Sequence, residues 1–97
     1  MRAAALRFEL HIHHSQSLKD KRAVIRPLVE GLRKLVSVSV AEVDYHDAWQ
    51  RAAVGVALVA ADAGRLDVLI TRVQRYFEDQ LELDVVKVEV HHMEEAP

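Results

Sequence analysis

The chain contains no cysteine and no asparagine among its 97 residues. Without cysteine, a disulfide bond, a thiol nucleophile and a Cys-based zinc or iron–sulfur site are all excluded. A chain without cysteine suits a reducing compartment, and we therefore expect a cytoplasmic protein. The absence of asparagine, a thermolabile residue, favours a thermophilic source.

Long apolar segments are missing as well. The longest apolar run, AAVGVALVAA, spans residues 52–61, which is half of the roughly 20 residues that a transmembrane helix needs. The first ten residues, MRAAALRFEL, are interrupted by Arg7 and Glu9, whereas a signal peptide needs a continuous apolar segment. We expect no contact with a membrane.

Basic residues number 13 against 15 acidic ones, and nearly half of them lie in one segment. The net charge is −2, yet the segment from Lys19 to Lys34 holds six basic residues against two acidic ones. Such a segment is suited to contact phosphate groups, while the acidic remainder argues against general binding to nucleic acids. The plainer interpretation is a solvated face of a helix.

Hydrophobic periodicity predicts six elements. Alternating or short apolar runs predict strands at residues 3–13, 36–44, 49–60 and 83–92. Helical spacing predicts one helix after Ser17 and another after Asp62, both of which are typical N-cap residues. Asp20 follows Ser17 at the capping-box distance, and Pro27 predicts a kink near Ala23 inside the first helix.

Three details concern the strands and the end of the chain. In the second strand the inward residues change phase after Val40, so that Val43 also points inward, which predicts a bulge near Val40. The last strand is expected to bury Val86 and to expose Val85. The tail HHMEEAP is expected to be frayed.

The order β-α-β-β-α-β predicts a single α+β domain over residues 1–97 with a ferredoxin-like fold. In that fold four antiparallel strands have the order 4-1-3-2, and both helices cover one face of the sheet. The first and last strands are then neighbours. Pairing Glu9 with Lys87 places Arg7 opposite Glu89, and both pairs have complementary charge.

This topology brings the loop 14–17, the start of the first helix and the hairpin 44–47 to one end of the molecule. Three kinds of chemistry are open there. The helix start and nearby cations favour binding of a phosphate or another anion; these residues are Ser17, Lys19, Lys21, Arg22 and Arg26. A divalent metal is the second possibility, with ligands drawn from His13, His14, His46, Asp44 and Asp47. The third is acid–base catalysis by His46, oriented by Asp44 or Asp47.

The hairpin also has plainer interpretations. Ser17 acts as an ordinary cap, the histidines are polar loop residues, and Trp49 closes the end of the core as a lid. In this structural interpretation Glu42 and Arg51 form a cross-strand pair. The alternative for Tyr45 and Trp49 is a recognition surface for a partner.

The helix-free face of the sheet excludes one common mode of RNA recognition. RNA-binding domains of this fold stack bases on exposed aromatic residues of their central strands. Here these positions hold Arg7, Glu9, His11, Ala53, Gly55 and Ala57, so no stacking platform is expected. Small residues along a central strand permit close approach of another surface, which favours a homodimer through this face.

Two motifs, SLKDKRAVIRPL at 17–28 and VSVAEVDYHDAWQRA at 38–52, resemble the bacterial YlxP-like family, a small domain of unknown function. The matching positions are Ser17, Leu18, Lys19, Lys21, Arg22, Glu42, Val43, Asp47, Trp49, Gln50 and Arg51. The sequence departs from the family at His13–His14 and in its acidic tail. The resemblance implies a ferredoxin-like fold. It also implies a gene position often beside translation initiation factor two and ribosome-binding factor A, and hence a ribosome-associated or RNA-associated role. It implies no catalytic residue.

We therefore predict a non-enzymatic interaction module that forms a homodimer and contacts the ribosome, ribosomal RNA or a translation factor. The predicted phosphate or RNA contacts are Ser17, Lys19, Lys21, Arg22 and Arg26. The predicted partner contacts are Asp44, Tyr45, His46, Asp47, Trp49, Gln50 and Arg51. No catalytic residue, metal or cofactor is assigned. The alternatives are a small hydrolase or phosphoryl-transfer enzyme that uses His46 and Asp47, and a purely structural homo-oligomer.

Overall fold

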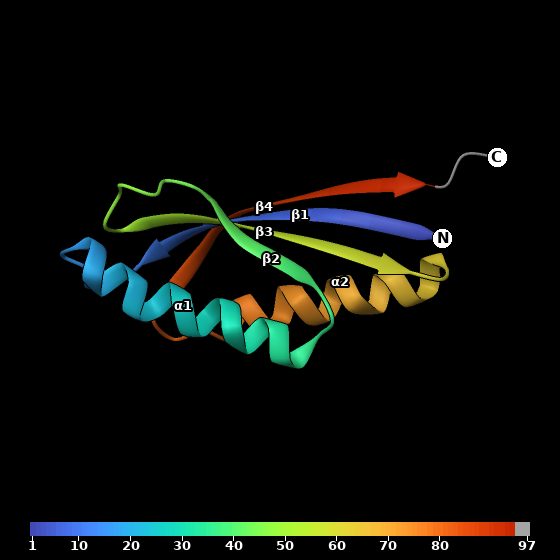
Figure 1. Cartoon of the computed structure of the whole chain (residues 1–97), viewed down its shortest axis with the longest axis horizontal. Coiled ribbons are helices and arrows are strands. Elements are labelled where there is room, and N and C mark those ends of the chain that lie inside the picture. Colours follow the sequence, from blue (N-terminus) through green and yellow to red (C-terminus); the bar gives the residue numbers. More distant parts are fainter. Residues whose placement is uncertain (95–97) are drawn as a thin grey trace.

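The computed structural model describes residues 1–94, which form four strands and two helices in the order β-α-β-β-α-β (Figure 1). The elements are β1 (Arg2–Ile12), α1 (Leu18–Leu35), β2 (Ser39–Asp44), β3 (Arg51–Ala60), α2 (Ala63–Glu78) and β4 (Leu83–Glu94). Each predicted element is present, with boundaries shifted by up to three residues. Among the described residues, no helix is long and apolar enough to cross a membrane.

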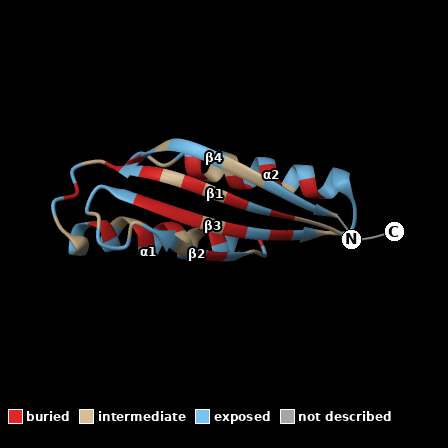
Figure 2. Cartoon of the chain, turned by 90° about the horizontal axis from the view of Figure 1, so that it is seen from above, coloured by how far each residue is buried: buried red, intermediate tan, exposed pale blue. Residues whose placement is uncertain are grey.

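The four strands form one antiparallel sheet with the order β2-β3-β1-β4. This is the predicted order 4-1-3-2 read from the other edge. The predicted register is also confirmed, because Glu9 lies opposite Lys87 and Arg7 lies opposite Glu89. Both helices pack on the same face of the sheet (Figure 1). The central strands β1 and β3 carry most of the buried positions of the sheet (Figure 2).

The core lies between the sheet and the helices. Alternate residues of the central strands face it, and so do helical residues spaced by three or four; the largest fully buried ones are Phe8, Phe77, Leu6, Leu10, Ile12, Leu32, Leu58, Val54 and Val73. The rings of Phe8 and Phe77 stack with their centroids 4.0 Å apart, which joins β1 to α2. The two helices meet where the Tyr76 hydroxyl donates to the Leu28 carbonyl oxygen at 2.6 Å.

The bulge in β2 lies at Val43, so the prediction of a bulge near Val40 was wrong. Glu42 pairs with Val54 and Asp44 pairs with Ala53, which leaves Val43 without a partner. The alternation of β2 therefore continues without a change up to Glu42, so that Val40 and Glu42 face the core side. Val43 lies on the helix-free face. There its Cγ1 is 2.9 Å from the place where a Cβ on Gly55 would lie.

A second bulge corrects the prediction for β4. Glu9 pairs with Lys87, but Leu10 pairs with Val85, so Val86 is the additional residue. Val86 is 67% exposed, while Val85 packs against the core. Residues His91 to Glu94 of the expected frayed tail belong to β4, and the remaining three lie outside the described residues.

Helix α1 continues through Pro27 without a break. Ser17 caps it as predicted, since its Oγ accepts the Asp20 N–H at 3.0 Å. Asp62 likewise caps α2 by accepting the Arg65 N–H at 2.8 Å.

Candidate functional site

The loop between β1 and α1, the start of α1 and the β2–β3 hairpin lie together at one end of the molecule, as the topology predicted (Figure 1). A hydrogen bond joins the two loops directly: the Gln50 side-chain amide donates to the Ser15 carbonyl oxygen at 3.0 Å. Both loops also contain a residue with left-handed backbone, His14 and Tyr45, each with φ of 59°.

The side chain of Lys21, on α1, binds the backbone of the β2–β3 hairpin. Its side chain is buried, with the whole residue 2% exposed. The ammonium donates to the carbonyl oxygens of Tyr45 at 2.7 Å and Arg51 at 3.2 Å, and more weakly to that of His46 at 3.4 Å. These contacts fix both sides of the hairpin to α1. Lys21 is therefore closed to a phosphate group, which removes it from the predicted phosphate contacts.

Glu42 supplies the charge that balances Lys21. Its Oε2 lies 3.1 Å from the Lys21 Nζ, and this oxygen is buried without a hydrogen bond of good geometry to any described residue. The pair is thus held by Coulomb attraction, together with the hydrogen bonds from Lys21 to the hairpin. A buried charge needs such a partner because desolvation disfavours it. The predicted pairing of Glu42 with Arg51 was wrong, because Glu42 follows the inward phase of β2.

On the helix-free face, Tyr45 folds back over the sheet. Its hydroxyl donates to Glu9 Oε1 at 2.8 Å, and the Arg51 guanidinium lies 4.2 Å from its ring centroid. Ala53, which lies opposite Glu9 on β3, is 0% exposed. Val43 also lies over Gly55, so two positions of the small-residue stripe are covered, while Ala57 stays exposed. The homodimer through this face stays a prediction.

Asp44 ties the hairpin to β1 through a second network. Its Oδ1 accepts the Tyr45 N–H at 2.7 Å, and its Oδ2 accepts from the Arg7 guanidinium at 3.1 Å. The Tyr45 N–H and then the Arg7 charge lower the pKa of Asp44 below its ordinary value. The same contact with Asp44 raises the pKa of Arg7. Asp44 is therefore held as a carboxylate with its oxygens in use.

The catalytic and metal sets expected at this end are not assembled. His46 Nε2 lies 3.3 Å from the Glu42 carbonyl oxygen, and within residues 1–94 no hydrogen bond joins it to Asp44 or Asp47. His13 instead contacts Asp84, a residue of β4. The helix start is also occupied, because the Ser17 hydroxyl accepts the Asp20 N–H and Asp20 accepts the Gln16 N–H. Ser17 is thus a cap.

Trp49 is exposed over 55% of its surface. The prediction that it closes the core as a lid was wrong. It lines a shallow hollow of about 600 Å³ with His11, Asp47 and Arg51, at the tip of the hairpin. An exposed tryptophan beside a hollow is available to a partner.

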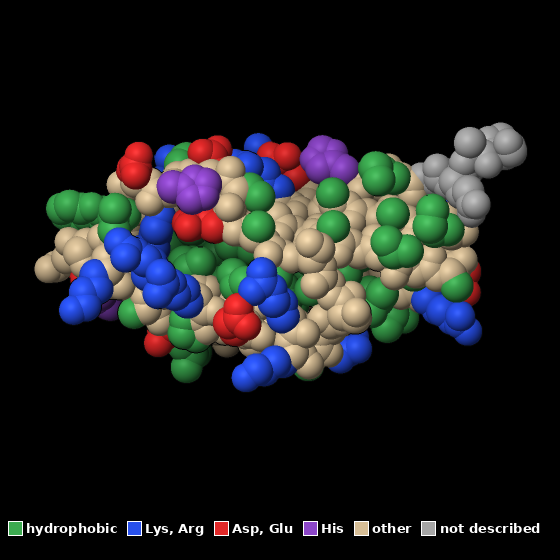
Figure 3. Space-filling view, viewed as in Figure 1, with side chains coloured by type: hydrophobic (Ala, Val, Ile, Leu, Met, Phe, Trp, Pro, Cys, Tyr) green, Lys and Arg blue, Asp and Glu red, His purple; other side chains and the backbone are tan. Residues whose placement is uncertain are grey.

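Beside this end, a groove of about 500 Å³ runs between α1 and the edge strand β2. Ile25, Val29 and Val40 form its apolar floor, and Arg22 and Arg26 stand on its rim. Figure 3 shows basic side chains gathered on this face around the apolar hollow. Among the described residues, Lys19, Arg22 and Arg26 have no hydrogen-bond or ion-pair partner.

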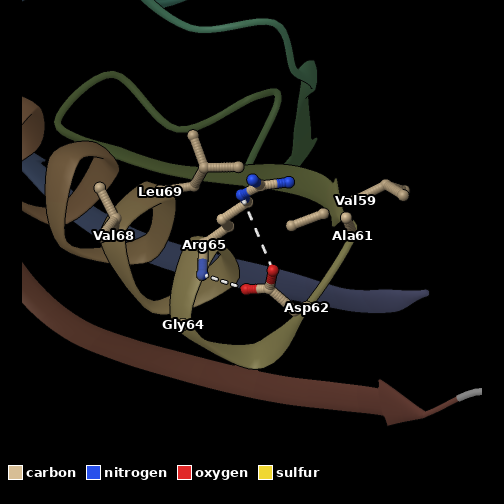
Figure 4. A pocket seen from close by; sticks show the side chains of 8 residues that line it. Val59, Ala61, Asp62, Gly64, Arg65, Val68 and Leu69 are labelled. Atoms are coloured by element: carbon tan, nitrogen blue, oxygen red, sulfur yellow. Dashed lines mark hydrogen bonds and ion pairs between the residues drawn. The ribbon is translucent and has the colours of Figure 1, made fainter.

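A further hollow of about 660 Å³ lies at the opposite end, between the end of β3 and the start of α2 (Figure 4). Its charged residues, Asp62 and Arg65, already serve the helix start: Asp62 accepts the Arg65 N–H at 2.8 Å and pairs with the Arg65 side chain at 3.7 Å. Apolar side chains such as Val59 and Val68 make up most of the remainder. This hollow has no group left for chemistry.

Sequence reasoning missed two residues here. Glu9 was placed on the open face but not in the hairpin network, and Glu42 was assigned the wrong partner. For Glu42 a signal was present: it continues the alternation of Val38 and Val40, which places its carboxylate on the core side. For Glu9 the signal was absent, since its contact depends on how Tyr45 folds back.

Comparison with known proteins gives a family but no activity. The family model "Protein of unknown function (DUF503)" matches residues 3–90. The "Uncharacterized protein YlxP" of Bacillus subtilis is 30% identical over 76 residues, which cover 78% of this chain and 83% of that protein. The resemblance to YlxP-like proteins is thereby confirmed.

Proposed function

This chain belongs to the DUF503 family of proteins of unknown function, and we propose that it is a non-enzymatic module that binds the phosphate backbone of RNA. We also propose that residues 1–97 form a single ferredoxin-like domain, which the strand order supports. The translation-related role implied for YlxP-like proteins makes ribosomal RNA the candidate ligand.

The observation that carries the proposal is the set of unpartnered cations on α1. Lys19, Arg22 and Arg26 follow at spacings of three and four residues, so they share one face of the helix. Like charges at these spacings destabilise a helix slightly, and none of the three forms a hydrogen bond or an ion pair with a described residue. Five other arginines have a partner: Arg7, Arg33, Arg51, Arg65 and Arg72. What distinguishes Lys19, Arg22 and Arg26 is that three unpartnered cations follow one another on one face of a helix. A row of free lysine and arginine side chains is the usual means of contacting phosphates.

The alternative occupant of the groove is an extended peptide that pairs with the edge strand β2. Two side chains oppose it. Arg33 donates to the Val40 carbonyl oxygen at 3.0 Å. His46 Nε2 lies 3.3 Å from the Glu42 carbonyl oxygen. Outward carbonyl groups of the edge are thus already occupied, which protects an edge from pairing. Phosphate binding by the rim needs none of these groups.

The test is fluorescence anisotropy with a labelled fragment of ribosomal RNA, together with co-sedimentation with ribosomal subunits, over a salt series. The variant Arg22→Glu/Arg26→Glu should lose binding to both. The control Lys34→Glu/Arg75→Glu changes the net charge equally, at exposed cations that have no partner among the described residues and lie outside the groove. It should bind within about twofold of the unmodified chain. Lys21 must be left intact, because its reversal would disrupt the hairpin.

Equal loss in the two variants would show that net charge, not the groove, governs binding, and would overturn the proposal. Absence of RNA binding at low salt would overturn it as well. Co-sedimentation without affinity for the RNA would assign the groove to a protein partner instead.

A further inference from the structure

The helix-free face carries a second cluster of polar side chains, on β1 and β4. His11 is the last residue but one of β1 and His13 follows the end of the strand; their ring centroids are 5.7 Å apart. Asp84 lies opposite His11 in the β1–β4 register. The His13 Nε2 is 2.8 Å from Asp84 Oδ2, and one ligand atom from each of the three residues lies within 4.8 Å of the other two.

The bulge at Val86 is what creates this cluster. If the pairing of Glu9 with Lys87 continued without a shift, His11 would lie opposite Val85. The additional residue moves Asp84 into that position and turns Val85 toward the core. Bulges commonly redirect a side chain at functional sites. The backbone irregularity thus places a carboxylate beside two imidazoles.

We propose that His11, His13 and Asp84 bind a divalent transition-metal ion of the Zn²⁺ class. Imidazole and carboxylate are ligands that such ions prefer, at about 2.0–2.2 Å. Two ligand atoms on one ion are then about 3 Å apart, close to the separation of His13 from Asp84. His11 is exposed and has no hydrogen bond to a described residue, so its ring is free to turn toward the ion.

Three protein ligands leave at least one position for water or for a ligand from solution. His11 also lines the hollow of about 600 Å³ that Trp49 and Arg51 share, so space adjoins the site. This proposal is independent of the RNA proposal, because its residues lie on the opposite face of the sheet from α1.

The experiment is isothermal titration of the full chain with Zn²⁺, repeated with Co²⁺ so that ligation is visible in the absorption spectrum. One ion should bind per chain. His11→Gln, His13→Gln and Asp84→Asn should each weaken binding at least tenfold, an effect expected even for supporting residues of metal sites. His14→Gln and His92→Gln remove histidines outside the cluster and should change affinity less than twofold.

NMR of the histidine rings in the unmodified chain provides a readout that needs no substitution. On addition of Zn²⁺, the ring nitrogens of His11 and His13 should shift and those of His14 and His92 should not. No binding, binding that survives the three ligand substitutions, or shifts confined to other histidines would overturn the proposal.

Discussion

The ammonium of Lys21, which is buried, and the carboxylate of Glu42, which is partly buried, form an ion pair between α1 and β2, with the Nζ 3.1 Å from Oε2. The same ammonium holds three carbonyl oxygens of the hairpin. One buried charge thus joins a helix, an edge strand and a loop.

Replacing Lys21 with Met should destabilise the protein by about 3 kcal/mol, because the partly buried Glu42 carboxylate loses its ion-pair partner and the hairpin carbonyl oxygens lose their donor. The double variant Lys21→Met/Glu42→Met should recover part of this loss, since no charge then remains. Urea unfolding measures both. Lys19→Met, an exposed control two residues away, should stay within about 0.5 kcal/mol of the unmodified chain. Equal effects of Lys19→Met and Lys21→Met would contradict the buried pair.

Gly31→Ala should destabilise the protein by up to about 2 kcal/mol, because overpacking costs about 1–3 kcal/mol and the change from Gly to Ala inside a helix offsets about 1 kcal/mol of it. A Cβ at Gly31 would lie 2.5 Å from the Tyr76 hydroxyl oxygen, which is itself anchored on the Leu28 carbonyl. Tyr76→Phe alone should cost about 0.5–1.5 kcal/mol for the lost hydrogen bond. In the Tyr76→Phe background, Gly31→Ala should cost clearly less, because the obstructing hydroxyl is gone. Strictly additive effects in this cycle would show that the two residues do not meet.

Asp44 should give the stability a dependence on acid pH. Because the Tyr45 N–H and Arg7 lower its pKa in the folded protein, its contribution is present above its ordinary pKa of about 4 and is lost as the pH falls through the lower folded value. The difference in unfolding free energy between the unmodified chain and Asp44→Asn should therefore shrink as the pH falls below about 4. Carboxyl NMR titration of Asp44 checks the direction, and a pKa above the ordinary value would contradict it.

Trp49→Ala should change the unfolding free energy by no more than about 0.5 kcal/mol, as for other surface substitutions. A tryptophan that closed the core would cost about 3–5 kcal/mol. The emission maximum of Trp49 should also change little on unfolding, since the ring is already in contact with water. A large blue shift in the folded state would show that the ring is buried after all.

The salt dependence of RNA binding should report the number of phosphate contacts. For single strands each contact contributes about 0.7 to the slope of log affinity against log salt. A double variant Arg22→Gln/Arg26→Gln, milder than charge reversal, should reduce that slope by about 1.4. The control Lys34→Gln/Arg75→Gln should leave the slope unchanged. An unchanged slope in the first variant would place the contacts elsewhere.

Much of the fold was predictable because it depends on local patterns. Alternation of apolar residues located the strands, and Ser17 and Asp62 located the starts of the helices. Complementary charge predicted the register in which Glu9 lies opposite Lys87. The candidate site was predictable only in its location. The direction of the strands determines which residues lie at the same end of the molecule. Which of their side chains are in contact depends on irregularities of one residue, such as a bulge in a strand.

By itself, the sequence determined the order of elements, the strand order and the end at which polar residues gather, because periodicity and crossover handedness restrict these to few solutions. Only the tertiary structure decided the roles of individual side chains. The bulges at Val43 and Val86 each add one residue, and the side-chain period of a strand is two. Each bulge therefore changes the face of the residues that follow it: the first places Asp44 opposite Ala53, on the side where it reaches Arg7, and the second places Asp84 opposite His11. Burial likewise distinguished Lys21, which balances Glu42 in the interior, from Lys19, Arg22 and Arg26, which remain free for a partner.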